Sequence, residues 1–129
     1  MGKGNREAAK PSDAAAQAAW LWKATAKGNP DAPVKLADMY IKGDGVPRSC
    51  DQAVVLLKTA AINENVRACN RLASMYATGI CVQRNHVETY RWLSSALLAD
   101  PNNGWAQQNR DLTWQQMTPG ERALAEKYR

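Results

Sequence analysis

The side chains that could do chemistry in this sequence are few, and they form no recognisable catalytic set. His86 is the only histidine, and a catalytic imidazole would need a nucleophile or a carboxylate beside it. Cys50, Cys69 and Cys81 contain no Cys-x-x-Cys pair, so they do not predict a zinc site. Gly43-Asp44-Gly45 follows no predicted strand and does not predict a phosphate loop. We therefore predict a protein that is not an enzyme and that uses no metal, cofactor or small-molecule substrate.

The chain is organised by an internal repeat. Residues 36–49 recur at 72–85, and apolar positions such as Leu21, Leu57 and Leu93 keep the same spacing of 36 residues. A fixed period in this range indicates a repeat array in which each unit buries its apolar face against its neighbours. The alanine-rich composition and the absence of phenylalanine fit an all-α array.

The repeated passage, Ala-x3-Leu-Ala-x-Met-Tyr-x2-Gly-x-Gly-Val-Pro-Arg followed by Leu-Leu-Lys-x-Ala-Ala, resembles the Sel1-like repeat family over roughly residues 16–112. The resemblance implies a tetratricopeptide-like α-solenoid that serves as a protein-interaction scaffold. Two departures stand out: Cys81 replaces the glycine found at Gly45, and the third copy lacks the Tyr-x2-Gly passage. Secreted members carry paired cysteines in each repeat, and Cys69 faces Ala61 at the partner position, which argues against that branch.

Glycines, Pro11 and mixed charges predict a disordered lead or linker over 1–12. The apolar periodicity predicts a repeat domain over 13–129, with repeats at about 13–48, 49–84 and 85–118 and a cap at 119–129. Predicted helices cover about 13–27, 30–42, 50–62, 66–78, 86–99, 101–115 and 119–128. Their predicted N-caps are Ser12, Asn29, Asn65, Asn85, Asp100 and Thr118. The predicted inward-facing side chains include Trp20, Trp92, Trp105, Leu112, Trp114, Leu124 and Tyr128.

The cysteines leave two alternatives open. If the loop at Cys81 needs a positive φ, as Gly45 allows in the first copy, Cys81 is strained; otherwise the loop has changed shape. Cys81 also stands in a loop before a helix, where a thiol can be reactive, although an incidental or packed thiol is the simpler interpretation. Three thiols without a pairing pattern favour a reducing compartment, and hence a cytoplasmic location.

The net charge of +5 and the pI near 9.3 come from charges spread along the chain, not from Lys/Arg runs. This distribution does not favour a nucleic-acid partner. Residues 14–26 imitate a signal peptide, but Leu21 and Ala24 already keep the repeat register, so a structural helix is the preferred interpretation. No apolar stretch reaches the length of a membrane span.

The candidate partner-binding residues lie on the first helix of each repeat, which lines the concave surface of related solenoids. After the apolar positions are removed, a basic, hydrogen-bonding strip remains that could hold an acidic or C-terminal peptide carboxylate. A solvated helix face is the alternative interpretation. The strip residues are Lys35, Asp38, Lys42, Arg67, Asn70, Arg71 and Ser74.

Trp22 is a further candidate, because its position in the second copy is taken by the charged Lys58, which predicts exposure. An exposed tryptophan could anchor a partner or cover a missing neighbouring repeat. Two functions follow from these features. The first is a peptide- or protein-binding adaptor, and the second is a module of a longer repeat protein that contacts neighbouring repeats or self-associates through its first helix.

Overall fold

The computed structural model describes residues 10–129, and this range is all helical, as the sequence predicts. The chain divides into two compact units, Met1–Leu56 and Leu57–Arg129, with the boundary inside α4. The elements are α2 (Lys10–Ala26), α3 (Ala32–Lys42), α4 (Cys50–Ile62), α5 (Val66–Thr78), α6 (His86–Ala99), α7 (Gly104–Gln116), α8 (Pro119–Ala125) and the 3-10 helix η1 (Glu126–Tyr128).

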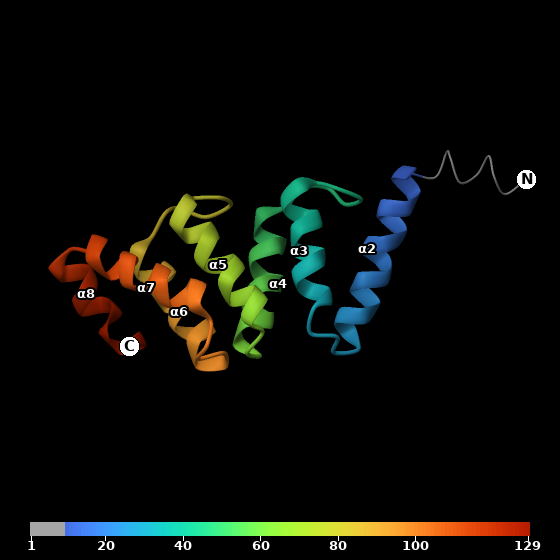
Figure 1. Cartoon of the computed structure of the whole chain (residues 1–129). Coiled ribbons are helices and arrows are strands. Elements are labelled where there is room, and N and C mark those ends of the chain that lie inside the picture. The colour runs from blue at the N-terminus through green and yellow to red at the C-terminus, as the bar shows by residue number, and fades with distance from the viewer. Residues whose placement is uncertain (1–9) are drawn as a thin grey trace, which may run out of the picture. The chain divides into compact units, whose positions relative to one another are not determined.

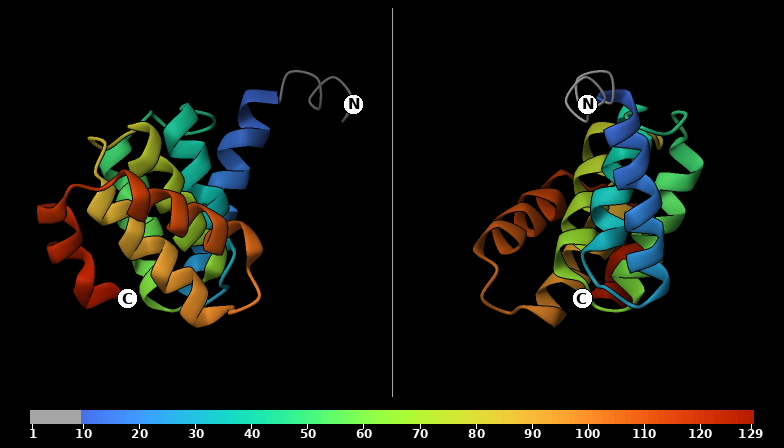
Figure 2. Two further views of the ribbon diagram at one scale, coloured as in Figure 1. Left: turned by 60° about the vertical axis from the view of Figure 1, so that its left-hand side comes forward. Right: turned by 90° about the vertical axis from the view of Figure 1, so that its right-hand side faces the viewer.

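The first unit is built on a helical hairpin. α2 and α3 run side by side in opposite directions (Figures 1 and 2). Leu21 of α2 and Leu36 of α3 are both buried, as the repeat register predicts. The loop after α3 turns at Gly43, whose φ of 71° lets its N–H bond to the Met39 carbonyl and end the helix.

Gly45 in this loop has no room for a side chain. Its φ is 78°, and a Cβ atom added there would lie 2.5 Å from the backbone carbon and oxygen of Ala14 in α2. The loop therefore packs directly on the first helix, and glycine is required for space as well as for conformation.

The second unit places α6 at its centre, in contact with α5, α7 and α8. Leu57, Leu72 and Leu93, which occupy the predicted apolar repeat positions, are all fully or almost fully buried. A further apolar cluster of Tyr90, Met117 and Ala125 fixes the C-terminal helices on α6. Its partly buried neighbours are Val87, Trp114 and Tyr128.

Local capping determines where the central helices begin. Asn65 and Asn85 sit in extended conformation, and their side chains accept hydrogen bonds from the N–H groups of Ala68 and Glu88. These bonds satisfy backbone donors at the helix start. The predicted boundaries of 50–62, 66–78 and 86–99 are confirmed. The capping box at Thr118 is also confirmed.

Three predicted helix starts are wrong. α2 already begins at Lys10, so Ser12 lies inside it and is not its N-cap; residues 1–9 of the predicted lead lie outside the described residues. The Asn29 side chain accepts hydrogen bonds from the N–H groups of both Asp31 and Ala32. These bonds close a turn before the helix begins, so the N-cap of α3 is Asp31. Asp100 likewise forms a turn, and α7 is capped by Asn103.

Four predicted core side chains are exposed instead. Trp20 is 64% exposed, Trp105 46%, Leu112 48% and Leu124 64%. They lie on α2, α7 and α8, where fewer helices surround each element than in the middle of a repeat array. The last helix is also shorter than predicted, because α8 ends at Ala125 and tightens into η1.

Candidate binding surfaces

The strip residues of the first unit lie on α3, on the side away from its buried leucine. Lys35 and Lys42 are exposed and two helical turns apart, and Asp38 between them is half-buried. Leu36 and Ala37, in contrast, are completely buried. The strip of α3 thus presents two ammonium groups to solvent, where a partner carboxylate could reach them.

Trp22 lies on α2 and contacts α3. Its indole Nε1 donates a hydrogen bond of 3.1 Å to the hydroxyl of Tyr40, and the two rings meet edge to face with centroids 6.1 Å apart. The tryptophan is 38% exposed, which confirms the predicted exposure. Because the polar edge of the indole is already bonded, the part that faces solvent is apolar.

The strip residues of the second unit lie on α5. Arg67 is exposed, whereas Asn70, Arg71 and Ser74 are half-buried. The Asn70 side chain has a structural contact that sequence reasoning missed: it accepts a hydrogen bond of 3.3 Å from the side chain of Asn103, the N-cap of α7. Asn70 thereby helps to fix the start of α7.

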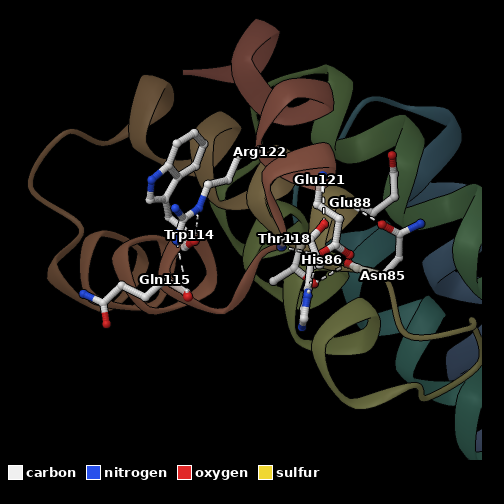
Figure 3. Close-up of polar contacts among 9 residues, drawn as sticks. Asn85, His86, Glu88, Trp114, Gln115, Thr118, Glu121 and Arg122 are labelled. Atoms are coloured by element: carbon white, nitrogen blue, oxygen red, sulfur yellow. Dashed lines mark hydrogen bonds and ion pairs between the residues drawn. The ribbon is translucent and has the colours of Figure 1, made fainter.

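His86 stands at the start of α6, beside the start of α8 (Figure 3). Its Nδ1 lies 3.4 Å from Oε1 of Glu121, and both side chains are 34% exposed. The same carboxylate oxygen accepts a bond of 2.8 Å from the Thr118 N–H, and the Glu121 N–H donates to Thr118 Oγ1 at 3.1 Å. His86 and Glu121 line an open hollow of about 750 Å³. Glu88, also drawn in Figure 3, lines it as well.

The electrostatics of this hollow favour a structural role for Glu121, at the place where the starts of α6 and α8 meet. The Thr118 N–H holds the pKa of Glu121 below its usual value, and the neighbouring His86 ring lowers that pKa further. An ionised carboxylate that caps a helix is not available as a general acid. Across the described range, this hollow included, no group of three or more His, Cys, Asp and Glu side chains could hold a metal ion.

The cysteines differ from the prediction. Cys50 and Cys81 are both disulfide-bonded, so the interpretation of all three as free thiols is wrong, and a reactive thiol at Cys81 is ruled out in this state. The argument from free thiols for a reducing compartment no longer holds. Cys69 alone is free; it is fully buried, and burial raises the pKa of its thiol to about 11. Cys81 has a φ of 65°, so its loop keeps the positive φ of Gly45, and the strained alternative is confirmed.

Sequence reasoning also missed a group of arginines and aromatic rings at the C-terminal helices. Arg122 donates a hydrogen bond of 2.9 Å from Nε to the Trp114 carbonyl, and its guanidinium carbon lies 5.4 Å from the centre of the Trp114 ring (Figure 3). Trp114 in turn packs on Tyr90, with ring centroids 5.3 Å apart. The missed signal is the spacing of Arg110, four residues before Trp114, and of Arg122, eight residues after it, which becomes meaningful only once the helices are placed.

Comparison with known families now identifies the repeat. The model of the Sel1 repeat matches residues 30–65 and 66–100, which is more than half of the chain. The chain belongs to the Sel1 repeat family. The matched segments begin close to the starts of α3 and α5, so each contains one of the two strip helices and the helix that follows it in the chain. Sel1 repeat proteins are generally non-catalytic and generally mediate protein interactions.

Two solved structures share the fold. A protective antigen of uropathogenic Escherichia coli strains that displays an SLR fold superposes with a TM-score of 0.75 and is 29% identical, over 86% of this chain and 24% of its own. A Sel1 repeat protein from Oxalobacter formigenes gives a TM-score of 0.66 and 25% identity, over 77% of this chain and 40% of its own. The chain thus spans less than half the length of either relative. No curated protein matches the sequence.

These likenesses support the predicted fold class, an α-α superhelix of the Sel1-like type. Within the described range, no helix combines the length and the apolar character that crossing a bilayer would require.

Proposed function

We propose that the chain is a non-enzymatic scaffold that binds a peptide or protein partner through the polar strip side chains of α3 and of α5. The observation that carries the proposal is the repetition of a basic residue next to a core leucine. Lys35 precedes Leu36, and Arg71 precedes Leu72, one repeat of 36 residues later. Both leucines are completely buried, and the turn of about 100° per residue puts the basic residue beside each one at the edge of the buried face, where Lys35 is exposed and Arg71 is half-buried.

The chemistry of the strip favours an acidic partner segment. The strip residues of α3 comprise two lysines and one aspartate, and those of α5 comprise two arginines and no acid. Carboxylates bind such groups through charge-assisted hydrogen bonds, which are stronger than neutral ones. The net charge of +5 would also speed the encounter with an acidic protein.

The test is partner capture with charge-reversed variants. The tagged wild-type chain is used to select binders from a displayed peptide library, and the selected peptides are titrated against Lys35→Glu and Arg71→Glu. Lys27→Glu and Arg84→Glu are the matched controls, because they make the same charge change at exposed positions outside the strip. Binding that weakens equally in strip and control variants would refute the strip and leave only a net-charge effect.

A second function is favoured by the exposed face of α2. Trp20 is 64% exposed on this helix, and the chain spans only part of the length of its solved relatives. On this hypothesis the chain is a module whose α2 packs against a neighbouring repeat or a second copy. Light scattering over a concentration series should then show self-association that Trp20→Lys or Trp22→Lys abolishes. A monomer at all concentrations in the wild type would contradict self-association.

A further inference from the structure

Asparagine side chains define a common register for three helices of the chain. The Oδ1 atoms of Asn29, Asn65 and Asn103 each accept a hydrogen bond of 3.0–3.1 Å from the N–H three residues later. That later residue is a buried alanine in every case: Ala32, Ala68 and Ala106. α3, α5 and α7 can therefore be compared position by position from these asparagines.

In this register an arginine replaces the central leucine of the repeat. The seventh residue after the asparagine is Leu36 in α3 and Leu72 in α5, and both are completely buried. In α7 the same position is Arg110, which is half-buried. A half-buried guanidinium in a core position needs a partner of opposite charge or a stacking ring.

Arg110 has only weak partners within the chain. Its guanidinium carbon lies 5.6 Å from the centre of the Tyr90 ring, and Nη1 lies 3.5 Å from Ser94 Oγ, at the limit of a hydrogen bond. None of the ion pairs formed by the described residues of this unit involves Arg110. A guanidinium that lies beside a ring keeps N–H groups at its edge that can bond to a further acceptor.

A pocket lies beside Arg110. Its volume is about 310 Å³, and it is lined by Tyr90, Arg110, Asp111, Trp114, Gln115 and Arg129. The Arg129 guanidinium lies 5.2 Å from the centre of the Trp114 ring, so two arginines flank a pair of packed aromatic rings. Arg129 pairs with Glu126 at 3.2 Å, but both side chains are more than half exposed, and such pairs are readily exchanged.

We infer that this pocket binds an acidic side chain of a protein partner, with the carboxylate on the Arg110 and Arg129 guanidiniums and an adjacent apolar side chain on the Tyr90 and Trp114 rings. The fork of an arginine matches the two oxygens of a carboxylate. The single acid of the lining, Asp111, accepts a hydrogen bond from Gln107 at 3.0 Å and weakens the positive field of the pocket. The inference shares with the proposed function only the premise of a protein partner, since none of the strip residues lines this pocket.

The experiment uses a fluorescein-labelled peptide of eight residues that alternates glutamate and leucine, with a glutamine–leucine peptide as its neutral control. Fluorescence anisotropy measures its affinity for the full chain. Arg110→Leu restores the leucine of the other two repeats, so this variant should melt no lower than the wild type. It should nevertheless bind the acidic peptide about tenfold more weakly or worse, because a charge-assisted hydrogen bond is lost.

Further variants separate this pocket from the α3 and α5 strips. Asp111→Asn should bind the peptide more tightly, and Lys35→Glu should change its affinity far less than Arg110→Leu. Unchanged affinity in Arg110→Leu, or the absence of binding to the wild type, would overturn the pocket. If only Lys35→Glu lost affinity for the acidic peptide, the pocket would also be overturned, and the result would support the proposed function. A labelled eight-nucleotide oligothymidylate serves as a second probe. If it bound more tightly than the acidic peptide, and lost affinity in Arg110→Leu, a protein partner would be the wrong ligand class.

Discussion

Replacing Gly45 with alanine should destabilise the protein more than the same replacement at Gly28. Both glycines have a positive φ, 78° and 90°, so each substitution forces alanine into the left-handed region. The two positions differ in the room for a side chain. A Cβ atom added at position 45 would lie 2.5 Å from the Ala14 backbone, whereas a Cβ atom added at position 28 would have no neighbouring atom within 4 Å. The pair therefore separates the cost of conformation from the cost of contact.

The magnitudes follow from these two terms. The left-handed conformation costs a non-glycine residue ~1–2 kcal/mol, and the lower entropy of the unfolded chain returns ~0.4–1 kcal/mol. Gly28→Ala should then lower the free energy of unfolding by about 1 kcal/mol or less. Carbon atoms pack at ~3.5–4.0 Å, so α2 must shift by about 1 Å at Gly45→Ala. Overpacking of this kind costs a further ~1–3 kcal/mol.

Urea unfolding followed by far-ultraviolet circular dichroism gives both values by linear extrapolation. The emission of Trp20 and Trp22, which lie on α2, reports whether this helix moves before the chain unfolds. A larger loss at Gly45 by at least ~1 kcal/mol would support the steric argument. Equal losses at the two positions would refute it, because conformation alone would then explain both.

Further predictions concern the cysteines and the C-terminal cap. Titration with Ellman's reagent should find one thiol, Cys69, in a denatured sample without reductant and three thiols in a reduced sample, because Cys50 and Cys81 are disulfide-bonded. Native protein at pH 8 should react slowly with the same reagent, since burial raises the pKa of the Cys69 thiol to about 11. Thr118→Ala should cost ~1 kcal/mol of stability, measured by urea unfolding, because the side-chain cap of α8 is lost. The pKa of Glu121 is lower in the folded chain, so its stabilising effect is present above the usual pKa of a glutamate and is lost as pH falls through the folded value. The stability gap to Glu121→Gln should therefore close on acidification, and a constant gap would contradict this reasoning.

The middle of the fold was predictable because its signals are local. Asn65 and Asn85 precede apolar runs of helical period, and each caps the helix that the pattern predicts. The burial of Leu36, Leu57 and Leu72 follows from the repeat register, which assigns each of them to an apolar position of its helix. In this region local preference and tertiary packing agree.

The predictions failed where two local signals compete. Asn29 and Asp100 are good N-caps by residue type, and each is followed by a proline that suits the first helical turn. In the structure, both side chains bond to the N–H two residues later, at Asp31 and at Asn102, which closes a turn before the helix begins. Which of the two hydrogen-bonded arrangements forms depends on packing that lies outside the local sequence.

Burial was mispredicted near the two ends of the described chain for a related reason. The apolar pattern marks Trp20, Trp105 and Leu112 as core positions, but a residue of an array is buried only if a neighbouring helix covers it. The pattern therefore identifies apolar faces correctly and cannot show which of them is covered. The disulfide state of Cys50 and Cys81 was missed in the same way, since it depends on proximity in space and not on spacing in the sequence.

The candidate pocket at Arg110 shows what a constant repeat offset conceals. An offset of 36 residues aligns Leu72 with Gln108, and no replacement of a core leucine by a charge is then visible. The capping bonds of Asn65 and Asn103 set the true offset at 38, because the turn before α7 is longer than the turn before α5. Only this register places Arg110 on the leucine position and Trp114 on the position of Tyr76. Because a core leucine exchanged for arginine gives up apolar burial, and Arg110 gains only weak partners within the chain, the exchange is better explained by a ligand than by packing.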